Sequence, residues 1–322
     1  MGTIRPRVAR VQTEVARTAT AGNGPPPVER RRDLPAGPAD TGCVATSDRL
    51  RRTVTDVRIT AVHDGVRSER PDTLATEEPM EIRVGGPGQP ARAVAVTMRT
   101  PGADYELAVG FLFTEGLIGP GEVRRVAYCD DLDDEEQRYN VVTVSLDRAF
   151  DHDRLHRNFF ATSSCGICGK AALDDVEVRC APVADGPAVR AEVLISLPEL
   201  LRARQRVFDR TGGLHAAGVF TPDGELVSLR EDVGRHNAVD KIIGEQVLAG
   251  RVPIAGHVLQ VSGRASFEIV QKAAVAGIPI VSAVSAPSSL AVEAGERFGM
   301  TIVGFVRDGR CNVYAGAQRV AT

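Results

Sequence analysis

Cys165 and Cys168 are the residues of this 322-residue chain whose types and spacing most clearly predict chemistry. A cysteine thiolate attacks sulfur electrophiles and binds soft metal ions. Gly166 and Gly169 follow the two cysteines, and such small neighbours leave a Cys-x-x-Cys pair open to a partner. The pair is compatible with three kinds of site: a redox disulfide, a zinc site and a carrier of persulfide sulfur.

A structural zinc site normally needs four ligands, often supplied as two cysteine pairs. Here a single Cys-x-x-Cys pair is present, although His215 and His236 could complete a four-ligand set through the fold. Zinc-dependent nucleobase deaminases use His-x-Glu followed by Pro-Cys-x-x-Cys. Neither motif is present, because Ser164 precedes Cys165 and His215 is followed by Ala-Ala-Gly.

A thioredoxin-like pair is expected after a strand in a small compact domain, whereas the glycines around Cys165 favour an exposed loop. Persulfide chemistry requires accessibility more than rigidity, and Lys170 would favour the anionic form of a neighbouring thiol. We expect Cys165 to be the sulfur-carrying nucleophile and Cys168 an auxiliary thiol.

Composition excludes several classes of protein. Hydrophobic residues make up 43% of the chain and charged residues 25%, which is enough for one large or two modest cores. The net charge of -3 lacks the excess of basic residues that a nucleic-acid-binding protein usually carries. Six irregularly spaced cysteines do not form a secreted disulfide scaffold. No apolar run approaches the roughly 18 residues of a membrane span. We expect a cytoplasmic protein without a nucleic-acid or membrane partner.

The chain divides into four regions. Residues 1–50 are rich in Arg, Pro and Gly without a hydrophobic period and predict a disordered tail. Residues 53–160 predict a smaller, strand-rich N-terminal domain, and residues 161–197 hold the cysteine loop and a connector. Residues 198–322 alternate helix and strand, which predicts a layered α/β domain with a largely parallel sheet.

Apolar periodicity places the elements within these regions. Strands are predicted at 57–62, 80–84, 93–98, 123–128 and 139–146, with a helix at 103–117. Helices at 198–209, 235–248, 266–276 and 287–298 then alternate with strands at 215–220, 226–229, 258–261, 278–284 and 301–306.

Three strand ends in the last region are suited to anions. Ser262-Gly263-Arg264 and the Ser285–Ser289 segment each lead from a strand into a helix, with Ser285 or Ala286 near the cap. Helix starts bind phosphates through free N–H groups and the helix dipole. The third end, Phe305–Arg310, places two arginines around a turn, where Asp308 could accept hydrogen bonds from a ring N–H. Each feature alone is also typical of an ordinary helix cap or hairpin turn.

The segment Glu231–Lys241 is unusually polar for a connection between a strand and a helix. In the structural interpretation, Asp232 caps the helix, while Asn237, Asp240 and Lys241 form its solvated face. A surface pair between Glu268 and Lys272 is predicted on the next helix.

Several motifs, taken in their order along the chain, together resemble the FdhD family of formate dehydrogenase accessory sulfurtransferases. The matching stretches are 81–84, 98–102, 106–112, 165–169, 211–218, 231–241, 262–270 and 285–292. The resemblance runs from about Thr53 to the C-terminus and leaves out the tail.

The resemblance implies a cytoplasmic sulfur carrier that accepts sulfur from a cysteine desulfurase and transfers it to the molybdenum cofactor, Mo-bis(molybdopterin guanine dinucleotide), for a formate dehydrogenase. It also implies a homodimer and a cytidine-deaminase-like α/β domain, with no resident metal. By match to the family pattern, the dinucleotide contacts are Phe305, Val306, Arg307, Asp308, Gly309 and Arg310. Ser262, Arg264 and Ser285 are added from the strand-end argument. The alternative is a chaperone that binds and delivers the cofactor without sulfur chemistry.

Overall fold

The structure is a computed structural model that describes residues 52–129, 138–152, 182–183 and 186–322. The predicted tail over residues 1–50 and both Cys165 and Cys168 lie outside these residues. The boundaries predicted for the four regions therefore stay predictions.

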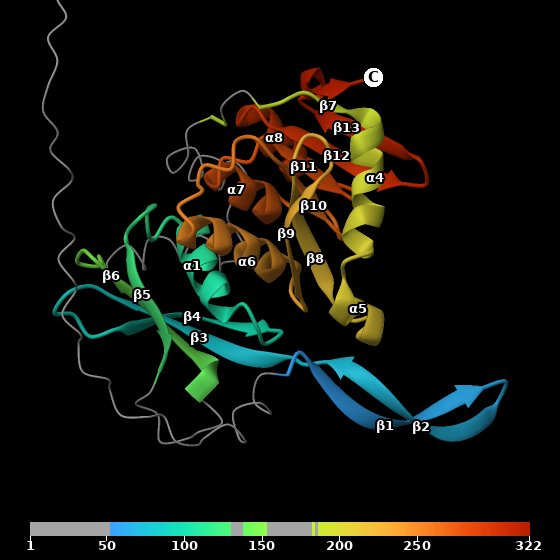
Figure 1. Ribbon diagram of the computed structural model, residues 1–322, viewed down its shortest axis with the longest axis horizontal. Coiled ribbons are helices and arrows are strands. Elements are labelled where there is room, and N and C mark those ends of the chain that lie inside the picture. Colours follow the sequence, from blue (N-terminus) through green and yellow to red (C-terminus); the bar gives the residue numbers. More distant parts are fainter. Residues whose placement is uncertain (1–51, 130–137, 153–181, 184–185) are drawn as a thin grey trace, which may run out of the picture. The chain divides into compact units, whose positions relative to one another are not determined.

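A four-stranded sheet and one helix account for much of the first half of the described chain (Figure 1). The strands are β3 (Glu78–Gly85), β4 (Arg92–Arg99), β5 (Val123–Tyr128) and β6 (Val141–Leu146), in the order β4-β3-β6-β5, and the helix is α1 (Asp104–Thr114). Alternation along β3 buries Met80, Ile82 and Val84 on the face that packs with α1, as expected for a strand with one covered face. These elements confirm the sequence prediction to within a few residues.

A two-stranded ribbon precedes this sheet. β1 (Val54–His63) and β2 (Val66–Ala75) pair in register along all ten residues of each strand, with Asp64 and Gly65 at the tip. The sequence predicted only the first strand, from 57 to 62, because β2 contains Arg67, Glu69 and Pro71 and carries no apolar alternation.

A six-stranded mixed sheet forms the second half of the fold. Its order is β13-β12-β11-β10-β8-β9. The strands are β8 (His215–Phe220), β9 (Leu226–Asp232), β10 (Val258–Val261), β11 (Ile280–Ala283), β12 (Thr301–Arg307) and β13 (Arg310–Ala315). β10, β11 and β12 are parallel, whereas the other pairs are antiparallel. The predicted largely parallel sheet is therefore wrong, because the short connections β8–β9 and β12–β13 are hairpins that can join only antiparallel strands.

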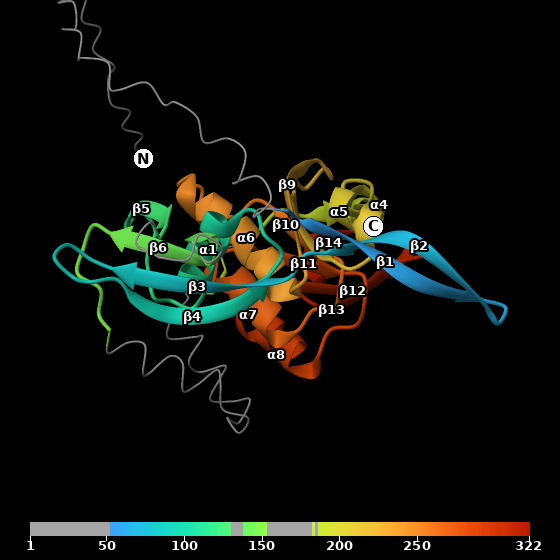
Figure 2. The same cartoon turned by 90° about the horizontal axis from the view of Figure 1, so that it is seen from below.

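Helices cover both faces of this sheet (Figures 1 and 2). The helices are α4 (Ala191–Arg202), α5 (Arg206–Thr211), α6 (Arg235–Leu248), α7 (Phe267–Val275) and α8 (Ser289–Arg297). α4 packs on Val258 and Ile280, while α6, α7 and α8 share a core with the opposite face of β10 and β11. A strand covered on both faces is apolar at nearly every position, which explains why these strands show no alternation.

Two helix boundaries differ from the sequence prediction. α4 begins at Ala191 and holds Pro198 in its interior, so the helix predicted to start at Pro198 is wrong, and α5 is a separate helix. The apolar face of α4 stabilises it despite the hydrogen bond that proline removes. α8 is capped by Ser288, whose hydroxyl accepts from the Ala291 N–H, rather than by Ser285 or Ala286.

Short elements complete the described ranges. They are the 3-10 turns η1 (Arg138–Asn140) and η2 (Ala317–Arg319), and the strands β7 (Val189–Arg190) and β14 (Val320–Ala321), which pair in parallel.

α1 and α6 cross closely and join the two sheets through a common core. A Cβ atom added at Gly110 would overlap the carbonyl oxygen of Asp240, and one at Gly244 would overlap that of Glu106. Glycine at both positions lets the two helix backbones approach, and Leu107 and Ile242 then belong to a single buried cluster. Within the described ranges, no helix is long and apolar enough to cross a membrane.

Candidate functional site

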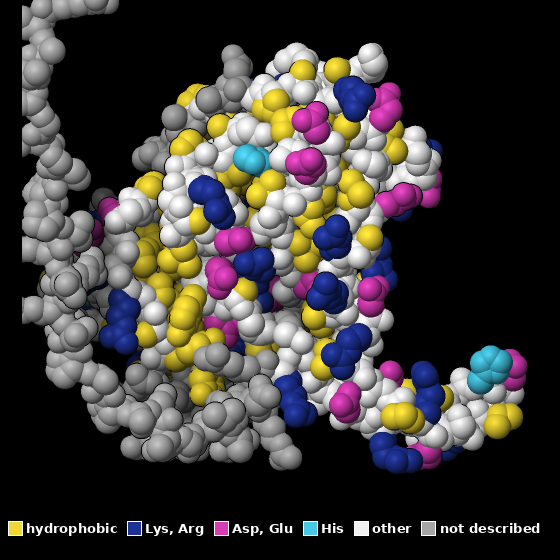
Figure 3. All heavy atoms as spheres, viewed as in Figure 1, with side chains coloured by type: hydrophobic (Ala, Val, Ile, Leu, Met, Phe, Trp, Pro, Cys, Tyr) yellow, Lys and Arg dark blue, Asp and Glu magenta, His cyan; other side chains and the backbone are white. Residues whose placement is uncertain are grey.

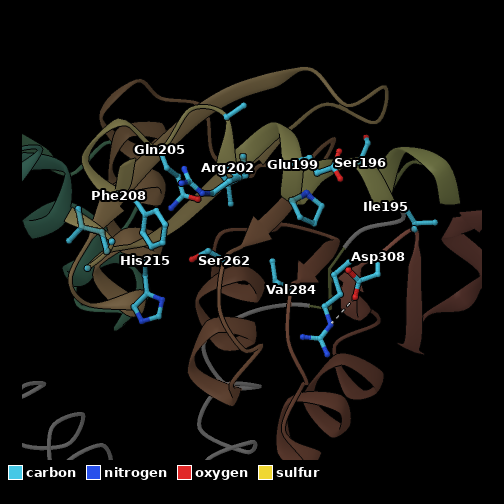
Figure 4. Close-up of a pocket in the computed structure, with 18 of the residues that line it drawn as sticks. Ile195, Ser196, Glu199, Arg202, Gln205, Phe208, His215, Ser262, Val284 and Asp308 are labelled. Carbon is cyan, nitrogen blue, oxygen red and sulfur yellow. Dashed lines mark ion pairs between the residues drawn. The ribbon is translucent and has the colours of Figure 1, made fainter. Parts of the chain in front are cut away.

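A cavity of about 1000 Å³ lies between helices α4 and α5 and the edge of the six-stranded sheet (Figure 4). Its volume is at the upper end of the range for small-molecule sites, roughly 300–1,000 Å³. One wall consists of strand ends, and the opposite wall consists of the side chains of α4 and α5. The lining residues used below are Glu192, Ile195, Ser196, Glu199, Arg202, Gln205, Phe208, Gly212, Gly213, His215, Ser262, Val284, Arg307, Asp308 and Gly309.

The strand-end wall exists because β10, β11 and β12 are parallel neighbours, so that their carboxyl ends meet at one edge of the sheet. Ser262, Val284 and Arg307 lie at these three ends and line the cavity. The Ser262 N–H donates to the Ala216 carbonyl, and the Ser262 hydroxyl accepts from the Ala216 N–H at 2.9 Å. Ser262 therefore extends the sheet as well as facing the cavity.

The predicted turn after β12 forms the far end of this wall. Asp308 and Gly309 have positive φ angles of 54° and 71°, as in the tight turns that suit right-twisted hairpins, and they place Arg307 opposite Arg310. The Arg307 guanidinium is 3.8 Å from the Asp308 carboxylate and lies over the Phe305 ring. Arg307 is half exposed, so its charge is accessible from the cavity.

The other predicted cofactor-binding residues lie near the cavity but do not line it. Arg264 and Arg310 are exposed, while Ser285 and Phe305 are partly buried and are joined by the Phe305 N–H donating to the Ser285 carbonyl. Val306 is fully buried in the core beneath α4. The structure thus brings together Ser262, Arg307, Asp308 and Gly309 of the nine predicted positions.

The helical wall of the cavity contains residues that were not predicted from the sequence. Ile195, Ser196 and Glu199 project from α4, and Arg202, Gln205 and Phe208 continue the wall into α5 (Figure 4). Ile195 and Ser196 fall in the predicted connector, and Glu199, Arg202 and Gln205 are typical of the polar face of a surface helix. Gly212 and Gly213, which belong to the matched stretch 211–218, line the cavity together with His215.

His215 faces the cavity as a neutral imidazole. Burial lowers its pKa, and the positive charge of Arg235 lowers it further, with Asp232 opposing both. A Cβ atom added at Gly263 would lie 3.6 Å from His215 Nδ1, so the loop after β10 passes directly over the ring. At neutral pH this side chain can exchange hydrogen bonds with a ligand but adds no positive charge.

The polar segment Glu231–Lys241 proves to be buried rather than solvated. Asp232 is fully buried and accepts hydrogen bonds from the Thr100 N–H at 3.2 Å, from the Gly234 N–H at 2.8 Å and from Asn237 Nδ2 at 3.0 Å. Lys241 Nζ lies 2.7 Å from the Asp232 carboxylate and donates to the Thr100 carbonyl. The predicted solvated face of α6 is therefore wrong, because β4 and α1 pack over it.

A second buried ion cluster lies at the junction of α1, α6 and α7. Lys272 Nζ is 3.0 Å from Asp240 and 3.3 Å from Glu115, and it donates to the Thr114 hydroxyl. Burial alone would lower the pKa of Lys272, but the two carboxylates outweigh it and raise the pKa. The predicted surface pair between Glu268 and Lys272 is wrong.

His236 lies in the first turn of α6 and is partly buried. Its Nε2 atom is 3.3 Å from the Ser266 hydroxyl and 3.8 Å from the Glu268 carboxylate. Burial, followed by the charge of Arg235, lowers its pKa to about 4, so the imidazole is neutral at neutral pH.

Among the described residues, no three His, Cys, Asp or Glu side chains converge into a metal-binding group. His215 and His236 are described, but Cys165 and Cys168 are not, so the four-ligand zinc alternative stays untested. On the face of the protein shown in Figure 3, Lys and Arg side chains are interspersed with Asp and Glu.

Comparison with known proteins places the chain in a family. The model of the FdhD/NarQ family matches residues 75–321. A Streptomyces coelicolor protein named sulfur carrier protein FdhD is 52% identical over 271 residues, covering 82% of this chain and 94% of that protein. A Sulfolobus acidocaldarius protein of the same name is 46% identical over 264 residues, covering 82% and 97%. The crystal structure of a candidate formate dehydrogenase accessory protein from Desulfotalea psychrophila is similar, with a TM-score of 0.65 and 26% identity, covering 84% of this chain and all of that one. From the family match and these relatives, we conclude that the chain belongs to the FdhD/NarQ family.

Proposed function

We propose that this protein is a sulfur carrier for the maturation of formate dehydrogenase. It takes sulfur from a cysteine desulfurase as a persulfide on Cys165 and transfers it to Mo-bis(molybdopterin guanine dinucleotide), the cofactor that the dehydrogenase then receives. The names of the relatives support the carrier role. The observation that carries the cofactor part of the proposal is the large cavity at the strand ends, with the Arg307 turn at one end.

The cavity suits one nucleotide arm of such a client. Arg307 supplies a guanidinium, which pairs with phosphate in a fixed planar geometry. The Gly309 backbone and the Ser262 region add polar groups without filling the space. Glu192, Glu199 and Asp308 also line the cavity, and carboxylates accept hydrogen bonds from the N–H groups of a base or the hydroxyls of a ribose. The cavity therefore offers different chemistry at different points, as a nucleotide requires.

The chemical step begins with the thiolate of Cys165. This thiolate attacks the terminal sulfur of a persulfide on the desulfurase, so that a new S–S bond forms at Cys165 and the desulfurase cysteine leaves as a thiolate. In the second step, the S–S bond at Cys165 breaks with its electron pair on the Cys165 sulfur, which returns to the thiolate. The client would supply the electron pair that bonds the transferred sulfur atom. Cys168 acts as the auxiliary thiol in this scheme.

The six-stranded sheet supports the proposed cytidine-deaminase-like arrangement. The strand order β9-β8-β10-β11-β12 combines an antiparallel hairpin with three parallel strands, and helices cover both faces. A shared fold carries no activity by itself, because the site must supply the chemistry.

Replacing Cys165 and Cys168 singly with Ala tests the sulfur step. We expect at least one variant to abolish the activation of formate dehydrogenase in cells that lack the native protein. Protein purified with its desulfurase should carry the mass of one additional sulfur atom on the peptide that contains Cys165. Full activity of the double variant would instead establish a chaperone that delivers the cofactor without sulfur chemistry.

We also propose that the protein forms a homodimer through the β1–β2 ribbon. The register places Val57, Ile59 and Ala61 on one face, opposite Asp72, Arg70 and Ser68, with Leu74 and Val66 at the two ends of that face. A two-stranded ribbon is marginally stable unless one face is covered. Opposite charges on Arg70 and Asp72 would pair across a two-fold axis if a second copy packed face to face.

Ile59→Asp tests this ribbon interface, and Val62→Asp is its matched control. Val62 is 65% exposed and lies on the opposite face of the same strand. We expect light scattering to show a dimer for the native protein and for Val62→Asp, but a monomer for Ile59→Asp. A native monomer, or a dimer in both variants, would remove this assignment.

The cytoplasm is the proposed location because the six cysteines do not fit a secreted disulfide scaffold and because persulfide transfer needs free thiols.

A further inference from the structure

Gln205 lines the cavity, and its side-chain amide has no hydrogen-bonding partner among the described residues. The residue is 3% exposed and lines the cavity, at the point where α5 begins. Its backbone N–H donates to the Arg202 carbonyl, but among the described residues neither the oxygen nor the nitrogen of its side chain has a partner. Because Gln205 lines the cavity, its amide can donate to and accept from a ligand or ordered water there.

A planar pair of side chains stands beside this amide. The Arg202 guanidinium lies over the Phe208 ring, 4.6 Å from its centroid, and both residues line the cavity with Gln205 (Figure 4). Aromatic rings and guanidinium planes are the surfaces on which proteins stack nucleobases. The cavity thus has a stacking surface and an amide at the same end.

This end of the cavity is held in place by Glu231. Its carboxylate accepts from the Phe208 N–H at 2.8 Å and from the Val207 N–H at 3.0 Å, which satisfies the first N–H groups of α5. Arg202 is fixed further by its ion pair with Asp209. Because α5 begins at Arg206, these contacts hold the backbone next to Gln205 in place.

We infer that Gln205 recognises the base of the bound nucleotide, with Phe208 and Arg202 as the stacking surface. This inference rests on the proposed function, which supplies guanine as the base and places the phosphates at Arg307. The amide nitrogen donates to the guanine O6 atom, and the amide oxygen accepts from the N1–H group. An amide is suited to this contact because it presents a donor and an acceptor side by side. Glu199, on the same helical wall, can accept from the exocyclic amine.

The experiment compares a ligand that has a base with one that lacks it. GDP and inorganic pyrophosphate are titrated into the full-length protein by calorimetry, using the native protein, Gln205→Met, Phe208→Leu and Arg307→Ala. Methionine preserves the length of glutamine and removes its hydrogen bonds. We expect Gln205→Met to weaken GDP binding about tenfold, the lower part of the range for a two-hydrogen-bond base contact, and to leave pyrophosphate binding unchanged. Phe208→Leu should act in the same direction, whereas Arg307→Ala should weaken the binding of both ligands.

Retained pyrophosphate binding shows that the Gln205→Met site is folded. The inference is overturned if GDP binds Gln205→Met within twofold of the native affinity while Arg307→Ala still weakens GDP, and the nucleotide cavity of the proposed function then survives. It is also overturned if the two ligands are weakened equally in Gln205→Met. If the native protein binds neither ligand, both the inference and the cofactor-binding part of the proposed function fail.

Discussion

Asp232 and Arg307 are the last residues of β9 and β12, so they lie where the strands of one sheet have their carboxyl ends. Their surroundings are nevertheless opposite. The Asp232 side chain is fully buried and bonded on both carboxylate oxygens, whereas the Arg307 side chain is half exposed at the cavity. The difference arises from the next layer of the fold, since β4 and α1 pack over the first strand end and a cavity borders the second.

The two positions show that a charge at a strand end has two distinct uses. At Asp232 the charge joins two layers of the fold, because its carboxylate pairs with Lys241 and accepts hydrogen bonds from Thr100 and Asn237. At Arg307 the single ion-pair partner among the described residues is the neighbouring Asp308 at 3.8 Å, so most of its hydrogen-bonding capacity remains available to a ligand. Substitutions should therefore affect stability at the first site and binding at the second.

The largest effect is expected from Lys241→Met. This change leaves the buried Asp232 carboxylate without its cation, and breaking a buried pair in this way costs about 3–5 kcal/mol. The free energy of unfolding, measured with urea, should fall by that amount. Arg264→Met, an exposed position at the same sheet edge, should change it by less than about 0.5 kcal/mol.

The double variant Asp232→Asn with Lys241→Met refines this test. Removing both charges avoids the unpaired carboxylate, so part of the lost stability should return. If Lys241→Met alone cost less than about 1 kcal/mol, the pair would behave like an exposed ion pair, and the comparison with Arg307 would fail.

The strand-end wall of the cavity was predictable because it depends on local rules. Apolar runs marked β10, β11 and β12, and the carboxyl ends of parallel strands meet, so Ser262 and Arg307 were expected near each other. The Asp308-Gly309 turn likewise follows from its sequence.

The buried role of Lys241 was not predictable, because it depends on contacts far away in the chain. Lys241 and Asn237 look like a solvated helix face until Met98 and Thr100, about 140 residues earlier, are packed over them. The α4 start was missed because Pro198 resembles a helix N-terminus, whereas tertiary burial of Leu194 and Leu201 stabilises it as an interior residue. Gln205 carries no sequence signal, since only the cavity reveals its unpartnered amide.

A smaller effect, on binding alone, is expected from Arg307→Ala. Loss of a charged hydrogen bond to phosphate should weaken GDP binding about tenfold, or more if the contact is bidentate, by roughly 1.5–3 kcal/mol. Arg310→Ala should have a smaller effect because Arg310 lies across the hairpin and does not line the cavity. Calorimetry measures both affinities, and the urea midpoints of both variants should match the native protein. Equal losses at the two arginines would show that the turn binds phosphate from both sides.

The smallest effect concerns His236, which is partly buried and interacts with Lys272 and Glu115 of the second ion cluster. Burial and then the charge of Arg235 lower its pKa to about 4, with Glu268, Lys272 and Glu115 also acting on the ring. In the unfolded chain, a histidine has a pKa of about 6.5, so between these values the unfolded state binds more protons than the folded state. The stability that depends on neutral His236 is therefore present above about pH 6.5 and is lost as the pH falls toward 4, by about 1–2 kcal/mol after solvent screening. His236→Gln keeps a polar group near Ser266 but cannot take up a proton. The difference in unfolding free energy between native protein and variant should thus shrink from pH 7 to pH 4.5, whereas parallel stability curves would show that His236 is as solvated as an exposed residue.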